Sequence, residues 1–302
     1  MPLRLPRFER AAADIPRFQL TGRDARLLRH VARHRFLSSR HLVQLLGGSR
    51  QPLLRRLRLL FHHGYLDRPK AQLDYFHRLG SRPLVYGLTR KAGRVLDPTA
   101  EPRQRPDNRM LKRLYLEHTL LIADVMVALE VACRDRTDLR LVHEDELTAG
   151  GARPFRWSVT VRHDGTSRRV GVVPDRVFIL ECPGERIHCC LEADRGTMPV
   201  RRSSLATSSF FRKLLAYEAT WTQGLHRQKF GIQRLRVLTV TTSPQRTESL
   251  REAARELAHG QGLFLFTEQD KLHDGDPLLL DWQGVREGDT SRLSSGGASR
   301  RR

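Results

Sequence analysis

The chain has 302 residues, enough for two ordinary domains, and 54 Lys and Arg against 33 Asp and Glu give it a formal net charge of +21. No apolar run reaches the roughly 18 residues of a membrane span, and the first residues contain no apolar signal core, so we expect a cytoplasmic protein without a membrane partner. The four cysteines form no Cys-x-x-Cys pair, which argues against a zinc ribbon or a dithiol redox site.

The positive charge is the strongest signal in the composition. Such an excess favours a polyanionic partner, and nucleic acid is the commonest one. Arginine greatly outnumbers lysine, so heavy arginine use by the host is an alternative source of part of the excess.

The first hundred residues have the pattern of a small helical domain that ends in a hairpin. Residues 1–18 lack periodicity and are predicted to be a flexible arm. Apolar residues then recur at helical spacing in three short segments between Thr21 and Gly64, and two strand-like segments follow, 65–68 and 83–88. Three helices followed by a hairpin is the order of a winged helix-turn-helix domain, which we predict over residues 19–97.

The third predicted helix alternates leucines with basic residues. A winged helix places this helix in the major groove of DNA, where arginine pairs with guanine or with phosphate, and its hairpin contacts phosphate or the minor groove. The candidate DNA-binding residues on the helix and the hairpin are Ser49, Arg50, Gln51, Arg55, Arg56, Lys70, His77, Arg78 and Arg82. The alternative is a domain that contacts only proteins, with the arginines as a solvated face.

Residues 98–108 are rich in proline and charge and are predicted to be a linker. A second domain is predicted over 109–283, followed by a disordered basic tail, 284–302. Its apolar patterns predict, in order, helix 109–134, strands 139–144, 156–162, 170–181 and 187–193, helix 208–223, strand 235–241, helix 245–258 and strand 263–266. This order fits the αβββαβ core of a PD-(D/E)xK restriction-endonuclease-like domain, so the predicted fold class is α+β.

Carboxylates occur where such a core carries its chemistry. Asp175 follows Pro174 on one strand, and Glu192 and Asp194 alternate on the next strand, so the side chains of Glu192 and Asp194 share one face. Three converging carboxylates would bind Mg²⁺ or Mn²⁺, and the metal would activate water for attack on a phosphodiester.

The metal-ligand candidates are therefore Asp175, Glu192 and Asp194, which together with Lys213 are also the catalytic candidates. Asp194 stands where the nuclease signature has lysine, and Lys213 on the following helix could supply the missing ammonium group. The alternative is that the carboxylates are structural and pair with arginines in a core that has lost catalysis.

Several of these segments together resemble a known family. They are the helical unit from Leu20 to Leu60, Tyr86-Gly87-Leu88-Thr89, Val173-Pro174-Asp175, and Leu191-Glu192-Ala193-Asp194-Arg195-Gly196-Thr197 with Lys213 and Tyr217. Over roughly residues 20–265 the chain resembles the replication-relaxation family of plasmids and mobile elements. The resemblance implies a winged helix followed by a nuclease-like domain, and a role in plasmid replication and relaxation.

The expected function is that of a DNA-binding protein of a plasmid or mobile element, acting in replication, relaxation or mobilisation. Its expected partners are double-stranded DNA, a second copy of the chain, and other replication or mobilisation proteins. One alternative is a metal-dependent DNA endonuclease or nickase that uses the carboxylate cluster with Mg²⁺ or Mn²⁺, and without that activity no cofactor is expected. A further alternative is a transcriptional repressor.

Overall fold

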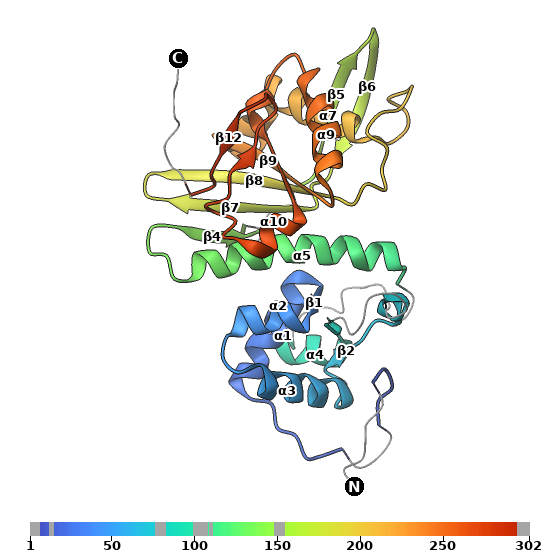
Figure 1. The fold of residues 1–302 in the computed structure, drawn as a ribbon, viewed down its shortest axis with the longest axis vertical. Helices are drawn as coiled ribbons and strands as arrows, with labels where there is room; N and C mark the ends of the chain where they lie inside the picture. Colours follow the sequence, from blue (N-terminus) through green and yellow to red (C-terminus); the bar gives the residue numbers. More distant parts are fainter. Residues whose placement is uncertain are drawn as a thin grey trace. The chain divides into compact units, whose positions relative to one another are not determined.

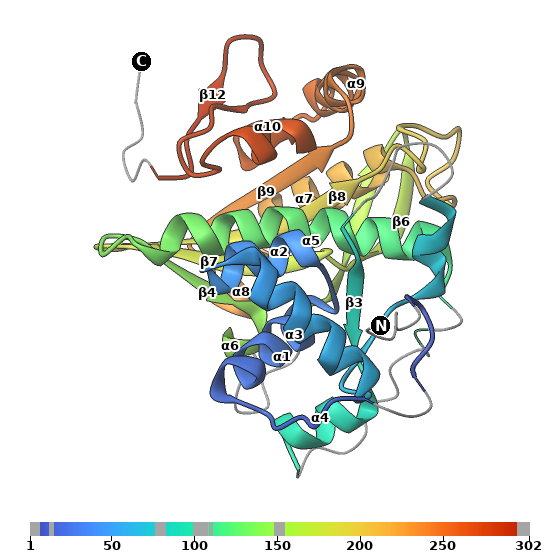
Figure 2. The ribbon, with the colours of Figure 1, turned by 60° about the horizontal axis from the view of Figure 1, so that its bottom comes forward.

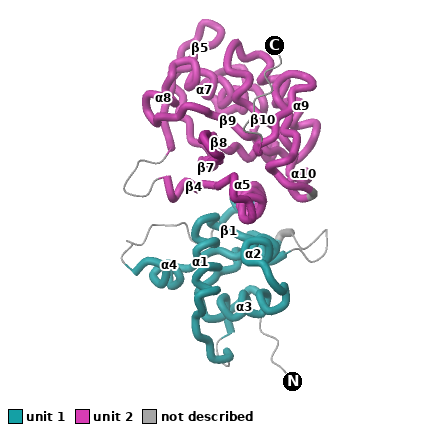
Figure 3. The backbone as a smooth tube through the Cα atoms, turned by 90° about the vertical axis from the view of Figure 1, so that its left-hand side faces the viewer, with its two compact units in different colours: residues 1–123 teal, residues 124–302 magenta. Residues whose placement is uncertain are grey.

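The computed structural model describes residues 7–11, 15–75, 83–98, 108, 111–147 and 155–294. It divides into two compact units, residues 1–123 (unit 1) and 124–302 (unit 2), which are coloured separately in Figure 3. The division falls inside the long helix α5 (Arg113–Arg134), whereas the predicted linker, 98–108, lies mostly outside the described residues. Helices and sheets occur in both units, which confirms the predicted α+β class.

Unit 1 combines short helices with a three-stranded antiparallel sheet of order β1-β3-β2. Its elements in chain order are α1 (Gly22–His34), β1 (Phe36–Ser38), α2 (Ser39–Leu46), α3 (Arg50–His62), β2 (Leu66–Asp67), a 3₁₀ helix (Lys70–Tyr75), β3 (Val85–Leu88) and α4 (Arg90–Leu96). A capping box between Thr21 and Asp24 starts α1, and the Ser38 side chain caps α2. Gly47 and Gly48 have positive φ angles of 61° and 78°, and they turn the chain from α2 into α3.

Gly87 lies in the central strand of this sheet, β3, and allows the Phe36 ring to approach that strand closely. A Cβ atom at this position would lie 2.6 Å from Cε1 of Phe36, a fully buried residue of β1. Phe36 and Val85 form a small core cluster with Leu116 of α5. The absence of a side chain at Gly87 is therefore what lets the Phe36 ring pack against β3.

Unit 2 is built on a seven-stranded sheet of order β12-β11-β10-β9-β8-β7-β4 (Figure 1). Strands β4, β7 and β8 pair antiparallel, whereas β8, β9 and β10 pair parallel. After α5, the elements in chain order are β4 (Arg140–His143), α6 (Glu144–Leu147), β5 (Trp157–His163), β6 (Thr166–Val172), β7 (Arg176–Cys182), β8 (Glu185–Asp194), α7 (Phe210–Thr222), α8 (Leu225–Phe230), β9 (Arg234–Thr241), α9 (Pro244–Arg255), a 3₁₀ helix (Gln261–Leu263), β10 (Phe264–Glu268), α10 (Gln269–Asp274), β11 (Trp282–Gln283) and β12 (Thr290–Ser291).

A large apolar cluster joins the layers of unit 2. It contains Val159 of β5, Leu214 and Leu215 of α7, Val237 of β9 and Leu250 of α9, all of them buried. Strands β5 and β6 form a separate hairpin, and its alternating valines face this cluster. The cluster therefore fixes α7 on the sheet, where it places polar side chains beside the end of β8.

Two predicted segments are corrected. The interval 170–181, predicted as one strand, is two strands, because β6 ends at Val172 and β7 starts at Arg176, after Pro174, which lacks a backbone N–H. The interval 284–294, predicted as part of a disordered tail, contains β12 and two buried side chains, Val285 and Leu293. Residues 295–302 of that tail lie outside the described residues.

The described parts of the predicted flexible arm, residues 7–11 and 15–18, contact the end of α3. The Arg10 Nε donates a hydrogen bond to the Phe61 carbonyl, and the Ala11 N–H donates to Nδ1 of His62. The Phe18 ring stacks on His63 with centroids 4.8 Å apart. These contacts give the arm a defined position that its aperiodic sequence does not indicate.

Among the helices of the described residues, none has both the length and the hydropathy needed to cross a bilayer.

Candidate nucleic-acid interface and carboxylate site

Helix α3 has one buried apolar side and one exposed basic side. Leu53, Leu57 and Leu60 are buried, and the residues of α3 that are exposed include Arg50, Gln51, Arg55 and Arg58. The helix contains no acidic residue. Among the described residues, no carboxylate pairs with Arg50, Arg55 or Arg58.

Arg56 is placed differently from its neighbour Arg55. Its Nε donates to Asp24 Oδ1 at 2.7 Å, and its guanidinium lies over the Phe18 ring, 4.1 Å from the centroid. Asp24 is only 1% exposed; burial would raise the pKa of its carboxyl, but hydrogen bonds from Arg56 and Thr21 outweigh burial and lower it. Arg56 therefore joins α3 to the start of α1, and the helical pattern around Arg56 contains no signal of that partner.

The structure describes only some of the remaining candidate DNA-binding residues. Ser49 is exposed at the N-cap of α3, and its side chain makes no capping hydrogen bond. Lys70 is exposed at the first residue of the 3₁₀ helix. His77, Arg78 and Arg82 lie outside the described residues.

The carboxylate site begins with Asp175, which directly precedes β7. Its backbone N–H donates to the Leu191 carbonyl at 3.0 Å, and its Oδ2 accepts from the Ala193 N–H at 2.8 Å. Two hydrogen bonds to β8 thus hold Asp175 next to Ala193, the residue between Glu192 and Asp194. The strand pairing brings together residues that lie far apart in the sequence.

Glu192 is buried and bound by two residues of α7. Lys213 Nζ lies 2.5 Å from its Oε2, and the Tyr217 hydroxyl donates to its Oε1 at 2.6 Å. Burial raises the pKa of Glu192, outweighing the nearby Lys213 ammonium. Burial would lower the pKa of Lys213, but the carboxylates of Glu192 and Asp175 outweigh it and raise the pKa.

Asp194 forms its ion pair with Arg246, whereas Glu192 pairs with Lys213. Arg246 of α9 donates from Nε to Oδ2 at 2.6 Å and from a terminal nitrogen to Oδ1 at 3.1 Å, and the Gly196 N–H donates to Oδ2 at 3.2 Å. Arg246 also donates to the Met198 carbonyl at 2.6 Å. The sequence analysis missed Arg246, and no motif near it could have shown the pairing, because α9 approaches Asp194 only in the folded chain.

The arrangement sets a condition on metal binding. Among the described residues, Asp175, Glu192 and Asp194 do not come together as a group of three ligands that could share one metal ion. Both oxygens of Glu192 and both of Asp194 already accept hydrogen bonds from the chain. A metal ion on Glu192 would therefore have to displace Lys213 or Tyr217, and Asp175, which is half-buried, already accepts a hydrogen bond from the Ala193 N–H.

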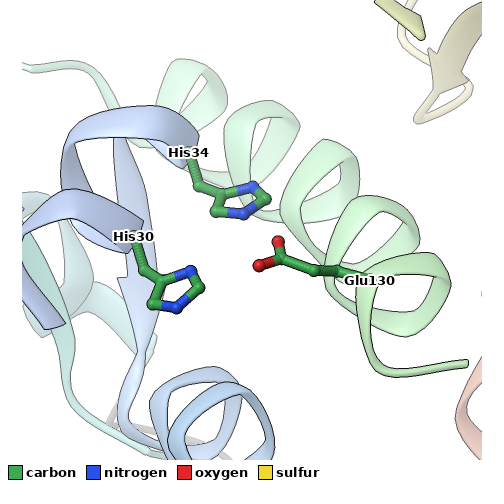
Figure 4. Close-up of side chains that lie close together, drawn as sticks. All are labelled: His30, His34 and Glu130. Carbon is green, nitrogen blue, oxygen red and sulfur yellow. The ribbon is translucent and has the colours of Figure 1, made fainter. Parts of the chain in front are cut away.

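Two histidines lie one turn apart on α1, His30 and His34. Figure 4 shows them together with Glu130 of α5. The histidines belong to unit 1 and Glu130 to unit 2. Within unit 2, Glu130 lies 3.6 Å from Nε2 of His143.

These features define a two-unit α+β protein with a basic helical surface in unit 1 and buried carboxylates paired with cations in unit 2. The model of the replication-relaxation family matches residues 28–235, more than half of the chain, and the chain belongs to that family. The match confirms the resemblance noted in the sequence and associates the chain with plasmid or mobile-element replication and relaxation. No curated protein and no solved structure matches the chain significantly.

Proposed function

We propose that the chain is a DNA-binding protein that acts in the replication or relaxation of plasmid or mobile-element DNA, and that α3 is the helix that contacts the duplex. The observation that carries the proposal is the exposed side of α3. Its three arginines, Arg50, Arg55 and Arg58, have no carboxylate partner among the described residues. Phosphate is the anion that such a cluster of guanidinium groups suits best.

The order of elements in unit 1 supports this role for α3. The order α1-β1-α2-α3-β2-β3, with a sheet of order β1-β3-β2, is the order of a winged helix. In that fold the third helix enters the major groove with its N-terminal residues on the base edges. Arg50 and Gln51 would then read bases, whereas Arg55 and Arg58, further along the helix, would contact phosphates.

The test is filter binding of the full chain to a linear duplex across a range of salt concentrations. Arg55→Ala and Arg58→Ala should each weaken binding several-fold and reduce the slope of log K against log salt by about 1. Arg94→Ala removes the same charge from an exposed position of α4 and is the matched control. If the control reduces affinity and slope as much as Arg55→Ala does, α3 is not the interface.

A second candidate function is a metal-dependent nuclease activity in unit 2. The observation that favours it is Lys213, because α7 places its ammonium on Glu192, beside Asp175. Mg²⁺ or Mn²⁺ would supply a Lewis acid and an activated water if bound there. The residues that would hold it are Asp175 and Glu192, and Lys213 would stabilise negative charge on the phosphate oxygens.

The nuclease candidate is tested by incubating supercoiled plasmid with the chain and either metal. Asp175→Asn keeps an oxygen that can accept from the Ala193 N–H but removes the charge, so it should fold and fail to nick. Asp164→Asn, at the exposed turn between β5 and β6, is the matched control and should nick like the parent chain. If the parent chain does not nick the plasmid but still retards it in a gel, the nuclease candidate is excluded and only DNA binding is supported.

A further inference from the structure

A cavity of about 500 Å³ opens in unit 2 where β9 and β10 begin. Its walls are the first residues of β9, the 3₁₀ helix Gln261–Leu263 and the segment 281–292; β9 and β12 can be followed in Figure 2. Asp194 pairs with Thr241 at the other end of β9, so the cavity is separate from the carboxylate site. Of its arginines, only Arg234 lies within the residues that the family model matches.

The charged side chains around the cavity are mostly cationic. They are Arg234, Arg236, Arg286 and Arg292 against Asp281 and Asp289. Arg292 pairs with Asp281 at 2.8 Å, and Arg234 pairs with Glu185 of β8. Among the described residues, no carboxylate pairs with Arg236 or Arg286.

Arg236 and Arg286, which have no described carboxylate partner, each donate a hydrogen bond to the 3₁₀ helix, at two consecutive residues. Arg236 donates to the Gly262 carbonyl, and Arg286 Nε donates to Gln261 Oε1 at 3.5 Å. The 3₁₀ helix therefore holds both guanidinium groups beside the same cavity, with further N–H donors on each. Burial, together with the charge of Arg234, lowers the pKa of Arg236, which is the effect expected for a cation that lacks a counter-ion.

We propose that this cavity binds a phosphate group, carried by a nucleotide or by a nucleic-acid strand, with Arg236 and Arg286 as its donors. Guanidinium groups bind phosphate through paired N–H donors, and two of them match the double negative charge of a terminal phosphate or more than neutralise the single charge of a phosphodiester. The volume falls within the range of small-molecule sites. A bound phosphate would also offset the unfavourable free energy of holding two cations without carboxylate partners around one cavity.

Calorimetric titration of the full chain with ADP, and separately with a six-nucleotide thymidine strand, tests the proposal and distinguishes the two sources of phosphate. The parent chain should bind at least one probe, and Arg236→Gln and Arg286→Gln should each weaken that binding by roughly tenfold. Arg227→Gln, at an exposed position of α8 that does not line the cavity, should leave it unchanged. Binding of ADP alone identifies a nucleotide site, and binding of the strand alone identifies a nucleic-acid site.

The proposal is overturned if neither probe binds, or if Arg227→Gln weakens binding as much as the cavity variants do. Thymidine-strand binding that survives unchanged in both cavity variants would belong to another surface and would also overturn it. Arg286 is exposed, so Arg286→Gln remains informative if Arg236→Gln proves unstable.

Discussion

Arg55 and Arg56 are adjacent in the sequence but have different surroundings, and a stability measurement should separate them. Arg56→Ala leaves Asp24 buried without its cation and should lower the free energy of unfolding by about 1–3 kcal/mol. Arg55→Ala removes an exposed side chain and should change it by no more than about 0.5 kcal/mol. Urea denaturation followed by circular dichroism makes the comparison.

Equal stability of the two variants would contradict a stabilising role for the ion pair between Arg56 of α3 and Asp24 of α1. The distinction also affects DNA-binding experiments. Weaker binding by Arg56→Ala cannot be separated from a disturbed α3, and this is why Arg55 and Arg58 are the informative positions.

His62 should make the stability of unit 1 depend on pH. It is 4% exposed, its Nδ1 accepts from the Ala11 N–H, and burial together with the charges of Arg68 and Arg58 lowers its pKa to about 4. Between pH 6.5 and 4 the unfolded chain therefore binds more protons at this residue than the folded chain does. The stabilisation is present above about pH 6.5 and is lost as the pH falls through this window, by an amount on the order of 2 kcal/mol.

Urea denaturation at pH 7 and pH 4.5 checks this. His62→Gln removes the titrating group, so the difference in stability between the two pH values should shrink. His259→Gln, at an exposed position, should retain the full difference. An identical loss in His62→Gln and the parent chain would show that other groups cause the acid sensitivity.

At the scale of an element, the sheet of unit 1 depends on a residue without a side chain. Gly87→Ala would place a Cβ 2.6 Å from Phe36 Cε1 and 3.2 Å from Asn108 Nδ2. The displaced Phe36 ring should reduce the stability of unit 1 by about 1–3 kcal/mol. Gly171→Ala, in strand β6 of unit 2, meets nothing within 4 Å and should be neutral or slightly stabilising. Thermal melts of the two variants should therefore differ, and similar melting temperatures would contradict the packing described for Phe36.

The elements that the sequence predicted well are those with long apolar periodicity, such as α7 and β9. Strand β1, with three residues, was not predicted, because a strand of that length is too short to show an alternating pattern. The interval 170–181 has apolar residues on both sides of Pro174-Asp175-Arg176, and this short interruption is the local sign of the break between β6 and β7. Pairing on a sheet, rather than local pattern, decides such boundaries.

At the scale of the whole molecule, the C-terminal segment completes the sheet of unit 2. A chain that ends at Asp281 would lose Trp282, which is fully buried, and would leave β10 as an edge strand. We expect it to lose several kcal/mol of stability or to aggregate. A chain that ends at Ser294 tests the remaining prediction of a disordered tail, which now concerns residues 295–302, and should melt like the full chain. Equal melting temperatures for both truncations would show that β11 and β12 contribute nothing.

The sequence by itself determined the α+β class, the family, the basic character of the third helix and the residues of β8 that bear carboxylates. These properties depend on composition, on local periodicity and on short motifs, which need no knowledge of distant contacts. The tertiary structure decided which partner each charge meets. Arg56 pairs with Asp24, Glu192 with Lys213 and Asp194 with Arg246, while Arg236 and Arg286 pair with no described carboxylate. An ion pair forms where folding brings two side chains within a few ångströms and removes water around them, and neither condition can be inferred from positions along the chain.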